Sequence, residues 1–401
     1  MQLEILQNNK ALKDCTINLK QLTSSIKIGV EASAALLNPA ILRRRELAAL
    51  RKKMSGKTEL LIKYKEKTLA NPRFDLISFY DGFQWREHKS WGNQIDKKLI
   101  EEALSFDKEI RGHALFTPAY MFAPPECRSM DRDKLREAVL QHIAALSKRH
   151  DPKALSWEVI HAAIEYNEIY EFIGIESILE IFETARKNFP GGKLFISDLN
   201  SLGEISENSL NDFIEFLDWL KAEEIIPDGL VLGVNLKRLD VAPQSMEKRL
   251  DKLSRSTKLP IHIRNLAVNE EDPEVQAAML RDYLLLFFAC KDVESVSFAE
   301  LWEELLLIPN MAIFDRKLEA KEAVNVIQKL LTEDWNSSQI LELDEEGIVQ
   351  ADLFLGDYEL EILKGDKQYT EKFTVKKAAK AVNISLNLND EFEKIPPQKV
   401  D

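Results

Sequence analysis

Cysteine is scarce in this 401-residue chain: Cys15, Cys127 and Cys290 stand far apart, and no CxxC pair occurs. This spacing excludes a disulfide framework and a zinc site of the usual type, so we expect buried free thiols. No apolar run approaches the roughly 20 residues that a membrane-spanning helix needs. The run from Tyr283 to Cys290 is too short to span a bilayer and is expected in the core.

An excess of positive charge is also missing, since 54 Lys and Arg residues stand against 67 Asp and Glu residues. Binding to a phosphate backbone needs a concentrated basic surface, so nucleic acid is not an expected partner. The sequence contains no G-x-G-x-x-G motif, no P-loop, and no His, Asp and Glu set with metal-ligand spacing. We therefore expect neither a cofactor nor a metal.

The first residues, Met1 to Asn9, lack the basic segment and apolar stretch of a signal peptide. The chain as given is therefore predicted to be cytoplasmic and not attached to a membrane, and extracellular or periplasmic if a leader has been removed. Its composition, 45% hydrophobic and 30% charged, excludes a disordered or low-complexity protein.

Short apolar runs alternate with segments of helical periodicity through most of the chain. Such alternation implies parallel strands, and eight units over about 300 residues favour a closed barrel over an open doubly wound sheet. The sequence therefore predicts an α/β protein with a (β/α)8 TIM barrel over residues 26–335. The predicted strands are Ile26 to Val30, Phe74 to Tyr80, Ala114 to Phe116, Trp157 to Ile160, Leu194 to Ile196, Gly229 to Val234, Ile261 to Leu266 and Ser295 to Phe298.

Both ends of the chain carry the period-two pattern of β-strands. Residues 1–25 form a predicted lead-in, with a hairpin from Leu3 to Leu19 that turns at Asn8 to Lys10. Residues 336–386 are a predicted antiparallel segment, because alternating runs are separated by the turn pairs Glu346-Gly347, Gly356-Asp357 and Gly365-Asp366. We expect the two ends to pack together as one small antiparallel β appendage, and residues 387–401 to form a flexible tail.

In a barrel of this kind the active residues lie at the carboxyl ends of the strands, and here several fragments resemble a known family in order and spacing. They are similar to the RGHxL, W-D-V-V-N-E, K-L-F-x-N-D-Y-N and P-I-x-I-T-E-L-D-V strands of the family-10 glycoside hydrolases, the endo-1,4-β-xylanases. The terminal segments resemble those of a bacterial subgroup of that family. The matching fragments are Arg111 to Leu115, Trp157 to Ala162, Lys193 to Asn200, Ile226 to Gly229, Leu259 to Val268 and Val293 to Phe298.

The resemblance implies retaining hydrolysis by two glutamates, about 5–5.5 Å apart, as acid/base and nucleophile. Carried over by position, the acid/base falls on Ala162 and the nucleophile on Asn265. Neither side chain can perform these roles, so no catalytic residue is assigned. Other family positions that face the sugar also differ, at His161, Thr117, Pro118, Asn235 and Ala299.

We therefore interpret the chain as a degenerate, non-catalytic xylanase-like barrel that binds a β-linked glycan or a protein partner. The residues expected to contact a sugar are Asp81, Gln84, His161, Asn235 and Asn265. Two alternatives stay open: an active glycoside hydrolase with relocated carboxylates, and an interaction protein with an occluded cleft.

The candidates for relocated carboxylates follow the fourth, seventh and eighth barrel strands: Glu165, Glu168, Glu270, Glu271, Glu300 and Glu303. Deeper in the barrel, Arg111, His113 and Glu158 are expected to form a buried, charge-paired layer.

Overall fold

The computed structural model describes residues 1–24, 26–43, 45–86, 93–147, 155–203, 208–236, 241–376 and 383–394. The chain divides into two compact units, one formed by Met1–Ser25 with Gln328–Asp401 and the other by Ile26–Ile327. No helix within the described ranges is both long and apolar enough to cross a membrane.

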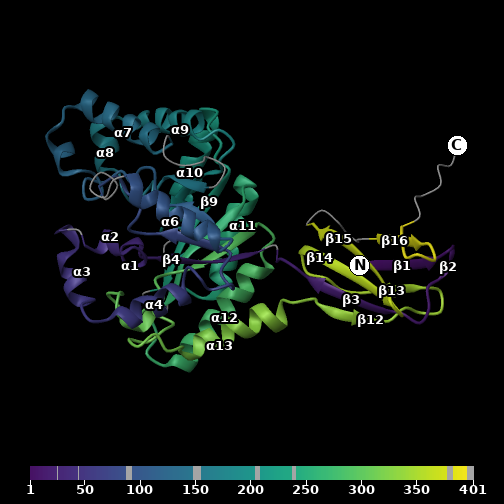
Figure 1. Cartoon of the computed structure of the whole chain (residues 1–401). Helices are drawn as coiled ribbons and strands as arrows, with labels where there is room; N and C mark the ends of the chain where they lie inside the picture. Colours follow the sequence, from purple (N-terminus) through teal and green to yellow (C-terminus); the bar gives the residue numbers. More distant parts are fainter. Residues whose placement is uncertain are drawn as a thin grey trace. The chain divides into compact units, whose positions relative to one another are not determined.

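The larger unit is a closed barrel of eight parallel strands with helices between them, which confirms the predicted (β/α)8 fold (Figure 1). Each barrel strand is buried nearly throughout, as expected for parallel strands covered by helices. The ladder runs in chain order and closes between the last and first strands. The strands are β4 (Lys27–Ala32), β5 (Leu76–Phe79), β6 (Glu109–Gly112), β7 (Leu155–Ile160), β8 (Leu194–Asp198), β9 (Gly229–Leu236), β10 (Ile261–Val268) and β11 (Val293–Phe298).

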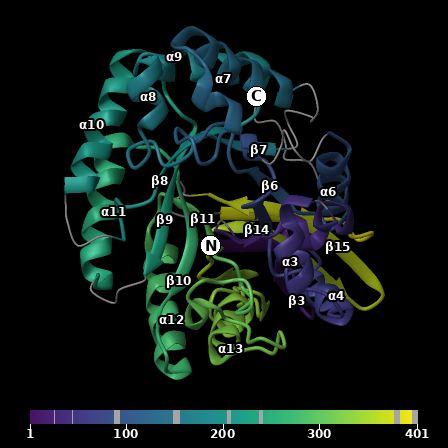
Figure 2. The same ribbon diagram turned by 90° about the vertical axis from the view of Figure 1, so that its left-hand side faces the viewer.

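Amphipathic helices pack around the outside of this barrel, and the view in Figure 2 shows α10, α11 and α12 outside the strands β8 to β10. The described helices of the unit are α1 (Ala34–Leu37), α2 (Pro39–Leu42), α3 (Ala48–Lys53), α4 (Thr58–Lys67), α6 (Asn93–Ser105), α7 (Arg132–Ser147), α8 (Glu168–Ile173), α9 (Ser177–Asn188), α10 (Asn208–Ala222), α11 (Pro243–Thr257) and α12 (Pro273–Ala289), with α13 (Glu322–Lys329) at its end.

The third barrel strand corrects the sequence prediction. It is Glu109–Gly112, not Ala114 to Phe116, and it pairs with Leu76–Ser78 and Leu155–Trp157. The apolar run was misleading because Phe116 is buried beyond the strand, where it makes a single bridge to Ile160. Gly112 is required at this point, since a Cβ there would lie 2.1 Å from the Trp157 ring.

The smaller unit consists of two sheets around a shared apolar core, and it joins both ends of the chain as predicted. One sheet has the order β13-β1-β16, with β2 beside β1, and the other has the order β12-β3-β14-β15. Figure 1 shows the purple first strands beside the yellow last ones. The strands are β1 (Gln2–Gln7), β2 (Lys10–Ala11), β3 (Thr16–Gln21), β12 (Gln339–Leu341), β13 (Ile348–Gln350), β14 (Gly356–Lys364), β15 (Lys367–Val375) and β16 (Asn383–Leu388).

Two details of this unit differ from the sequence predictions. The single hairpin from Leu3 to Leu19 is wrong, because β1 turns back only onto β2 and β3 joins the other sheet. The flexible tail from residue 387 is wrong up to residue 394, because β16 pairs in parallel with β1 and buries Leu388. Phe392 is also buried, so one apolar contact beyond the last strand orders this polar segment.

Candidate functional site

A cluster of buried charged side chains lies inside the barrel and connects strands β4, β7 and β10. The guanidinium of Arg264 on β10 donates to both Glu158 carboxylate oxygens on β7, at 3.1 and 3.0 Å, and to Glu31 on β4 at 2.8 Å. None of the three side chains is more than 3% exposed. One cation between two carboxylates gives each buried charge a partner, which is the condition for placing charges in a protein interior.

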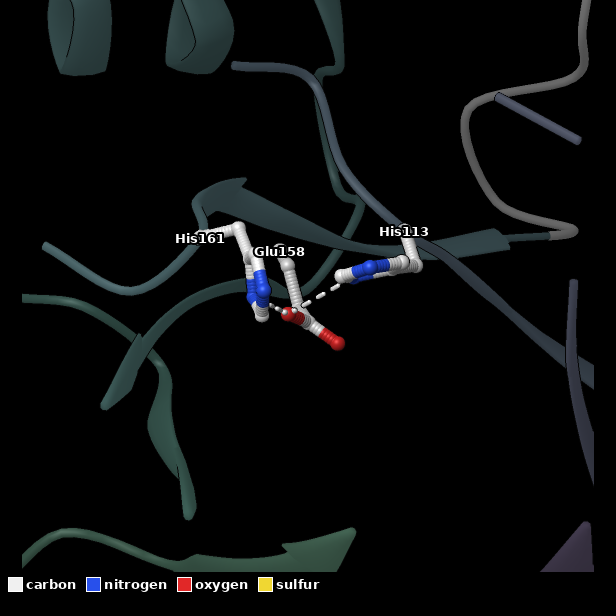
Figure 3. Close-up of side chains that lie close together, drawn as sticks. All are labelled: His113, Glu158 and His161. Carbon is white, nitrogen blue, oxygen red and sulfur yellow. Dashed lines mark hydrogen bonds and ion pairs between the residues drawn. The ribbon is translucent and has the colours of Figure 1, made fainter. Parts of the chain in front are cut away.

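Two histidines complete this cluster, and in Figure 3 both rings point toward Glu158. The Nδ1 atoms of His113 and His161 each lie 3.2 Å from a Glu158 oxygen, and the two rings meet edge to face at 4.2 Å. Burial and the Arg264 charge lower the pKa of His113 to about 3, and burial also lowers the pKa of His161. Both imidazoles are therefore neutral near pH 7.

Glu158 is the ionised centre of the cluster. Burial by itself would raise the pKa of Glu158, but the Arg264 charge and the histidine contacts hold that pKa well below its usual range. The predicted layer of Arg111, His113 and Glu158 is thus right for the last two. Arg111 is buried as well, but it lies over the Phe195 ring and donates to Ser295 at 3.4 Å.

The ligand atoms of His113, Glu158 and His161 lie close enough together to hold a metal ion. Arg264 Nη1, however, is 2.7 Å from His113 Nδ1, 3.0 Å from Glu158 Oε2 and 3.4 Å from His161 Nδ1. A guanidinium nitrogen therefore already occupies the position that faces all three atoms. A divalent cation does not fit this arrangement, because it would sit against a fixed positive charge.

The two positions that the resemblance aligns with the catalytic glutamates have an unusual backbone. Ala162 follows β7 with a φ of 51°, and Asn265 lies within β10 with a φ of 54°. The strand pairing shifts register between Glu158 and Ile160 and again around Asn265. Ala162 is fully buried and Asn265 half-buried, and neither side chain is a carboxylate.

The other predicted sugar contacts have different local roles. Asp81 accepts from Ser33 Oγ at 2.7 Å and from the Ala34 N–H at 2.6 Å, and burial raises its pKa to about 6. Gln84 is buried and donates to the Tyr80 carbonyl at 3.4 Å. Asn235, at the end of β9, is half-buried, and its Oδ1 has no hydrogen-bond partner among the described residues.

Two of the candidate relocated glutamates are distinctive. Glu300 after β11 accepts from Tyr64 Oη at 2.7 Å and Tyr80 Oη at 3.2 Å, and burial raises its pKa to about 7. Burial and the charge of Asp198 raise the pKa of Glu165, after β7, to about 7. Four steps of the eight-strand ring separate β7 from β11, so these two groups stand on opposite sides of the barrel.

The carboxyl ends of β10 and β11 carry a small apolar cluster. Ala299, one of the positions at which we expect this chain to differ from the family, packs with Ala267 and Met311, and Leu306 and Ile308 lie against them. Aliphatic side chains of the segment that follows β11 thus pack at this end of the two strands.

Sequence reasoning did not identify Arg264 and Glu31 as members of the central cluster. A charged residue in the middle of an apolar strand was the available signal, since such residues are almost never buried unless paired. The pairing itself could not be predicted, because the three charged residues come from β4, β7 and β10, which are far apart in the sequence.

Comparison with known proteins finds xylanases and a related regulatory protein among the sequence relatives of this chain. The chain is 22% identical over 320 residues to endo-1,4-beta-xylanase 2 of Arabidopsis thaliana, covering 79% of this chain and 30% of that protein. It is 26% identical over 277 residues to the anti-sigma-I factor RsgI6 of Acetivibrio thermocellus, covering 68% of this chain and 35% of that protein. The chain thus spans about a third of the length of these curated relatives.

Solved structures show the same barrel. Xylanase 10B from Thermotoga petrophila in complex with xylobiose aligns with a TM-score of 0.62 at 18% identity, over 77% of this chain and 95% of that one. The intracellular xylanase of Thermoanaerobacterium saccharolyticum aligns with a TM-score of 0.59 at 19% identity, over 80% and 99% of the two chains. The model of glycosyl hydrolase family 10 matches residues 57–330, more than half of the sequence, and the chain therefore belongs to that family.

Proposed function

We propose that this barrel does not hydrolyse xylan and instead binds a β-linked oligosaccharide at the carboxyl ends of its strands. Family membership supports a glycoside hydrolase or carbohydrate-binding function. The observation that carries the choice between these two is the presence of Ala162 and Asn265 on a retained backbone geometry. A methyl group cannot supply a proton, and a neutral amide cannot act as the nucleophile of a retaining glycosidase.

The remaining carboxyl groups do not make a substitute pair. Glu165 accepts from the Leu199 N–H after β8, whereas Glu300 accepts from Tyr64 and Tyr80, so each carboxyl group is bound on its own side of the barrel. A glycosidase needs about 5–5.5 Å for retention or about 6.5–9.5 Å for inversion. Glu165 and Asp198 are hydrogen-bonded to each other, which is closer than either mechanism uses.

Sugar binding is supported by the polar groups that remain near the strand ends. Asn235 Oδ1 is an acceptor without a protein partner, and the half-buried Asn265 offers both a donor and an acceptor. We include Asp81, Gln84 and His161 in the proposed binding set because they follow β5 and β7 at the same end of the barrel. A relative of the same fold was solved with xylobiose, which suggests xylo-oligosaccharides as the first ligands to test.

Isothermal titration calorimetry with xylohexaose tests this proposal. We expect saturable binding by the wild-type chain and a loss of about fivefold in affinity in Asn235→Ala or Asn265→Ala, since one hydrogen bond contributes about 1 kcal/mol. Asn325→Ala, an exposed amide on α13, is the matched control and should bind as the wild type does. Failure of xylo-, cello- and manno-oligosaccharides to bind a folded chain would contradict the proposal and favour a protein partner.

The raised pKa of Glu300 favours a second candidate, a hydrolase with relocated carboxylates, because a general acid needs a pKa near the working pH. This candidate requires a second carboxylate on the same side of the barrel, and Asp81 is an acidic group whose charge raises the pKa of Glu300. It predicts measurable turnover of a β-linked substrate that disappears in both Glu300→Gln and Asp81→Asn.

A further inference from the structure

Two carboxyl groups meet where the loop after β7 approaches the end of β8. Glu165 Oε1 accepts from the Leu199 N–H at 2.9 Å. Asp198 Oδ2 accepts from the N–H groups of Asn200 and Ser201 at 3.1 and 2.7 Å and from the Ser201 hydroxyl. The two remaining oxygens, Glu165 Oε2 and Asp198 Oδ1, are buried and receive no N–H or hydroxyl donor among the described residues.

The same two side chains are hydrogen-bonded to each other. A carboxylate has no hydrogen to donate, so such a bond exists only while one of the two groups is protonated. We infer that one proton shared between Glu165 and Asp198 fastens the loop after β7 to the end of β8, and that losing this proton releases the loop.

The surroundings of the pair offer little compensation for a second negative charge. On the same loop Glu165 is followed by the Tyr166 phenol, whose pKa is raised by burial and by Glu165. On the β7 side His161 is buried and neutral. From α11, Arg249 donates to the Leu202 carbonyl at 3.2 Å, in the loop that follows Asp198. The fully ionised pair therefore places two like charges together in a mostly buried site.

The titration of this pair falls in an accessible range. Burial and the Asp198 charge raise the pKa of Glu165 to about 7, and burial raises the pKa of Asp198 as well. The pair shares its proton below about pH 7 and carries two charges above it. Because the pKa values of the two carboxyl groups are raised, the link between them is intact at low pH and is lost as the pH rises.

The loop that this link holds carries the family's acid/base position. Its other ties to β8 include the Ala162 N–H and the His161 ring on Ser197 Oγ, at 3.0 and 2.9 Å, and the Ala163 N–H on the Ser197 carbonyl at 3.0 Å. These bonds do not use the carboxyl pair and remain when the proton leaves. Only the part of the loop beyond Ala163, which leads to α8 at Glu168, depends on the carboxyl pair. The inference is independent of whether a glycan binds.

Hydrogen exchange of the backbone amides tests this inference on the whole chain. We compare the protection factors of peptides covering residues 161–170 at pH 6.0 and pH 8.5, corrected for the intrinsic pH dependence of exchange. The wild-type loop should lose protection by about tenfold or more at the higher pH, since each pK unit beyond the titration corresponds to a factor of ten. Peptides from β10 should not change.

Two substitutions of Glu165 and one control substitution distinguish the effect of the shared proton from the effect of side-chain packing. In Glu165→Gln the amide donates permanently to Asp198, so the loop should stay protected at both pH values. In Glu165→Ala the link is absent, so protection should be low at both, and Glu183→Gln on the exposed face of α9 should behave as the wild type. The inference is overturned if wild-type protection is the same at both pH values, or if Glu165→Gln retains the wild-type pH dependence. The infrared band of a protonated carboxyl group at pH 6.0, absent in Glu165→Gln, is a second readout that does not depend on loop motion.

Discussion

The interior of the barrel and the rim formed by its strand ends differ in whether their buried carboxyl groups are paired with a cation. In the interior, Arg264 forms ion pairs with both Glu158 and Glu31. At the rim, Glu165, Asp198 and Asn235 each keep a buried oxygen that receives no N–H or hydroxyl donor within the part of the chain that the structure describes. The pKa values of Glu165 and Glu300 are accordingly raised to about 7 by burial.

Arg264 gives Glu158 and Glu31 a cation from within the fold, so this interior pairing does not need a ligand. Unsatisfied groups at strand ends are typical of places where a protein binds or reacts. The strand ends of this family-10 barrel are therefore the region to which we assign the proposed binding function.

The largest expected effect comes from breaking the interior network. Arg264→Met should destabilise the chain by about 3–5 kcal/mol, because Glu158 and Glu31 would remain buried without their cation. Urea unfolding followed by circular dichroism measures the change, and the exposed Arg255→Met on α11 is the control. A loss below about 1 kcal/mol would mean that the cluster tolerates an unpaired charge.

The close packing of Gly112 against Trp157 should be almost as important for the stability of the barrel. Gly112→Ala places a Cβ 2.1 Å from the Trp157 ring, so β6 or the indole must move. We expect a loss of about 3 kcal/mol, at the upper end of overpacking costs. Gly203→Ala is the matched control, because its nearest neighbour would lie 3.9 Å away. Equal melting temperatures for the two variants would contradict this packing.

The contribution of Glu300, at the rim, to the free energy of unfolding should depend on pH. The folded pKa of Glu300 is about 7 against an ordinary value of 4.5, so the folded state holds its proton more tightly than the unfolded state. Its stabilising contribution is complete below pH 4.5 and is lost as the pH rises toward 7, by an amount on the order of 3 kcal/mol.

Urea unfolding at several pH values checks this prediction. Glu300→Gln should flatten the decline between pH 4.5 and 7, and Glu294→Gln on the same strand is the charge-matched control. An unchanged pH profile in Glu300→Gln would show that Glu300 is not a source of the pH dependence.

The smallest expected effect concerns the retained backbone. Ala162 holds a φ of 51°, which costs a residue with a Cβ about 1–2 kcal/mol, so Ala162→Gly should be stabilising by about 0.5–1 kcal/mol. Asn265→Gly should gain less, because asparagine tolerates this conformation. Differential scanning calorimetry distinguishes the two, and a destabilised Ala162→Gly would contradict the assignment of strain.

Much of this architecture could be predicted from the sequence. Alternating runs and helices defined the barrel, and period-two patterns at both ends defined the appendage. The third strand was misplaced because burial at Phe116 looks the same whether or not the residue is in the sheet. Segment 387–394 was misjudged because its order depends on contacts with distant parts of the chain: β16 pairs with β1, and Leu388 and Phe392 pack into the core of the smaller unit.

The candidate site was less predictable for a physical reason. Ala162 and Asn265 could be found by position along the chain, since each belongs to one strand. The partners of Arg264 and the pairing of Glu165 with Asp198 depend on contacts between strands, and no local pattern encodes them.

Hydrolysis of xylan and of an aryl β-xyloside by the purified chain tests the central claim most directly. The account predicts no turnover above background in the wild type and no more than a trace in the double variant Ala162→Glu with Asn265→Glu. The supports that tune and orient a catalytic pair are also replaced, and placement errors of about 1 Å can cost on the order of 100-fold. Wild-type turnover that survives repurification and is abolished by Glu165→Gln or Glu300→Gln would contradict it.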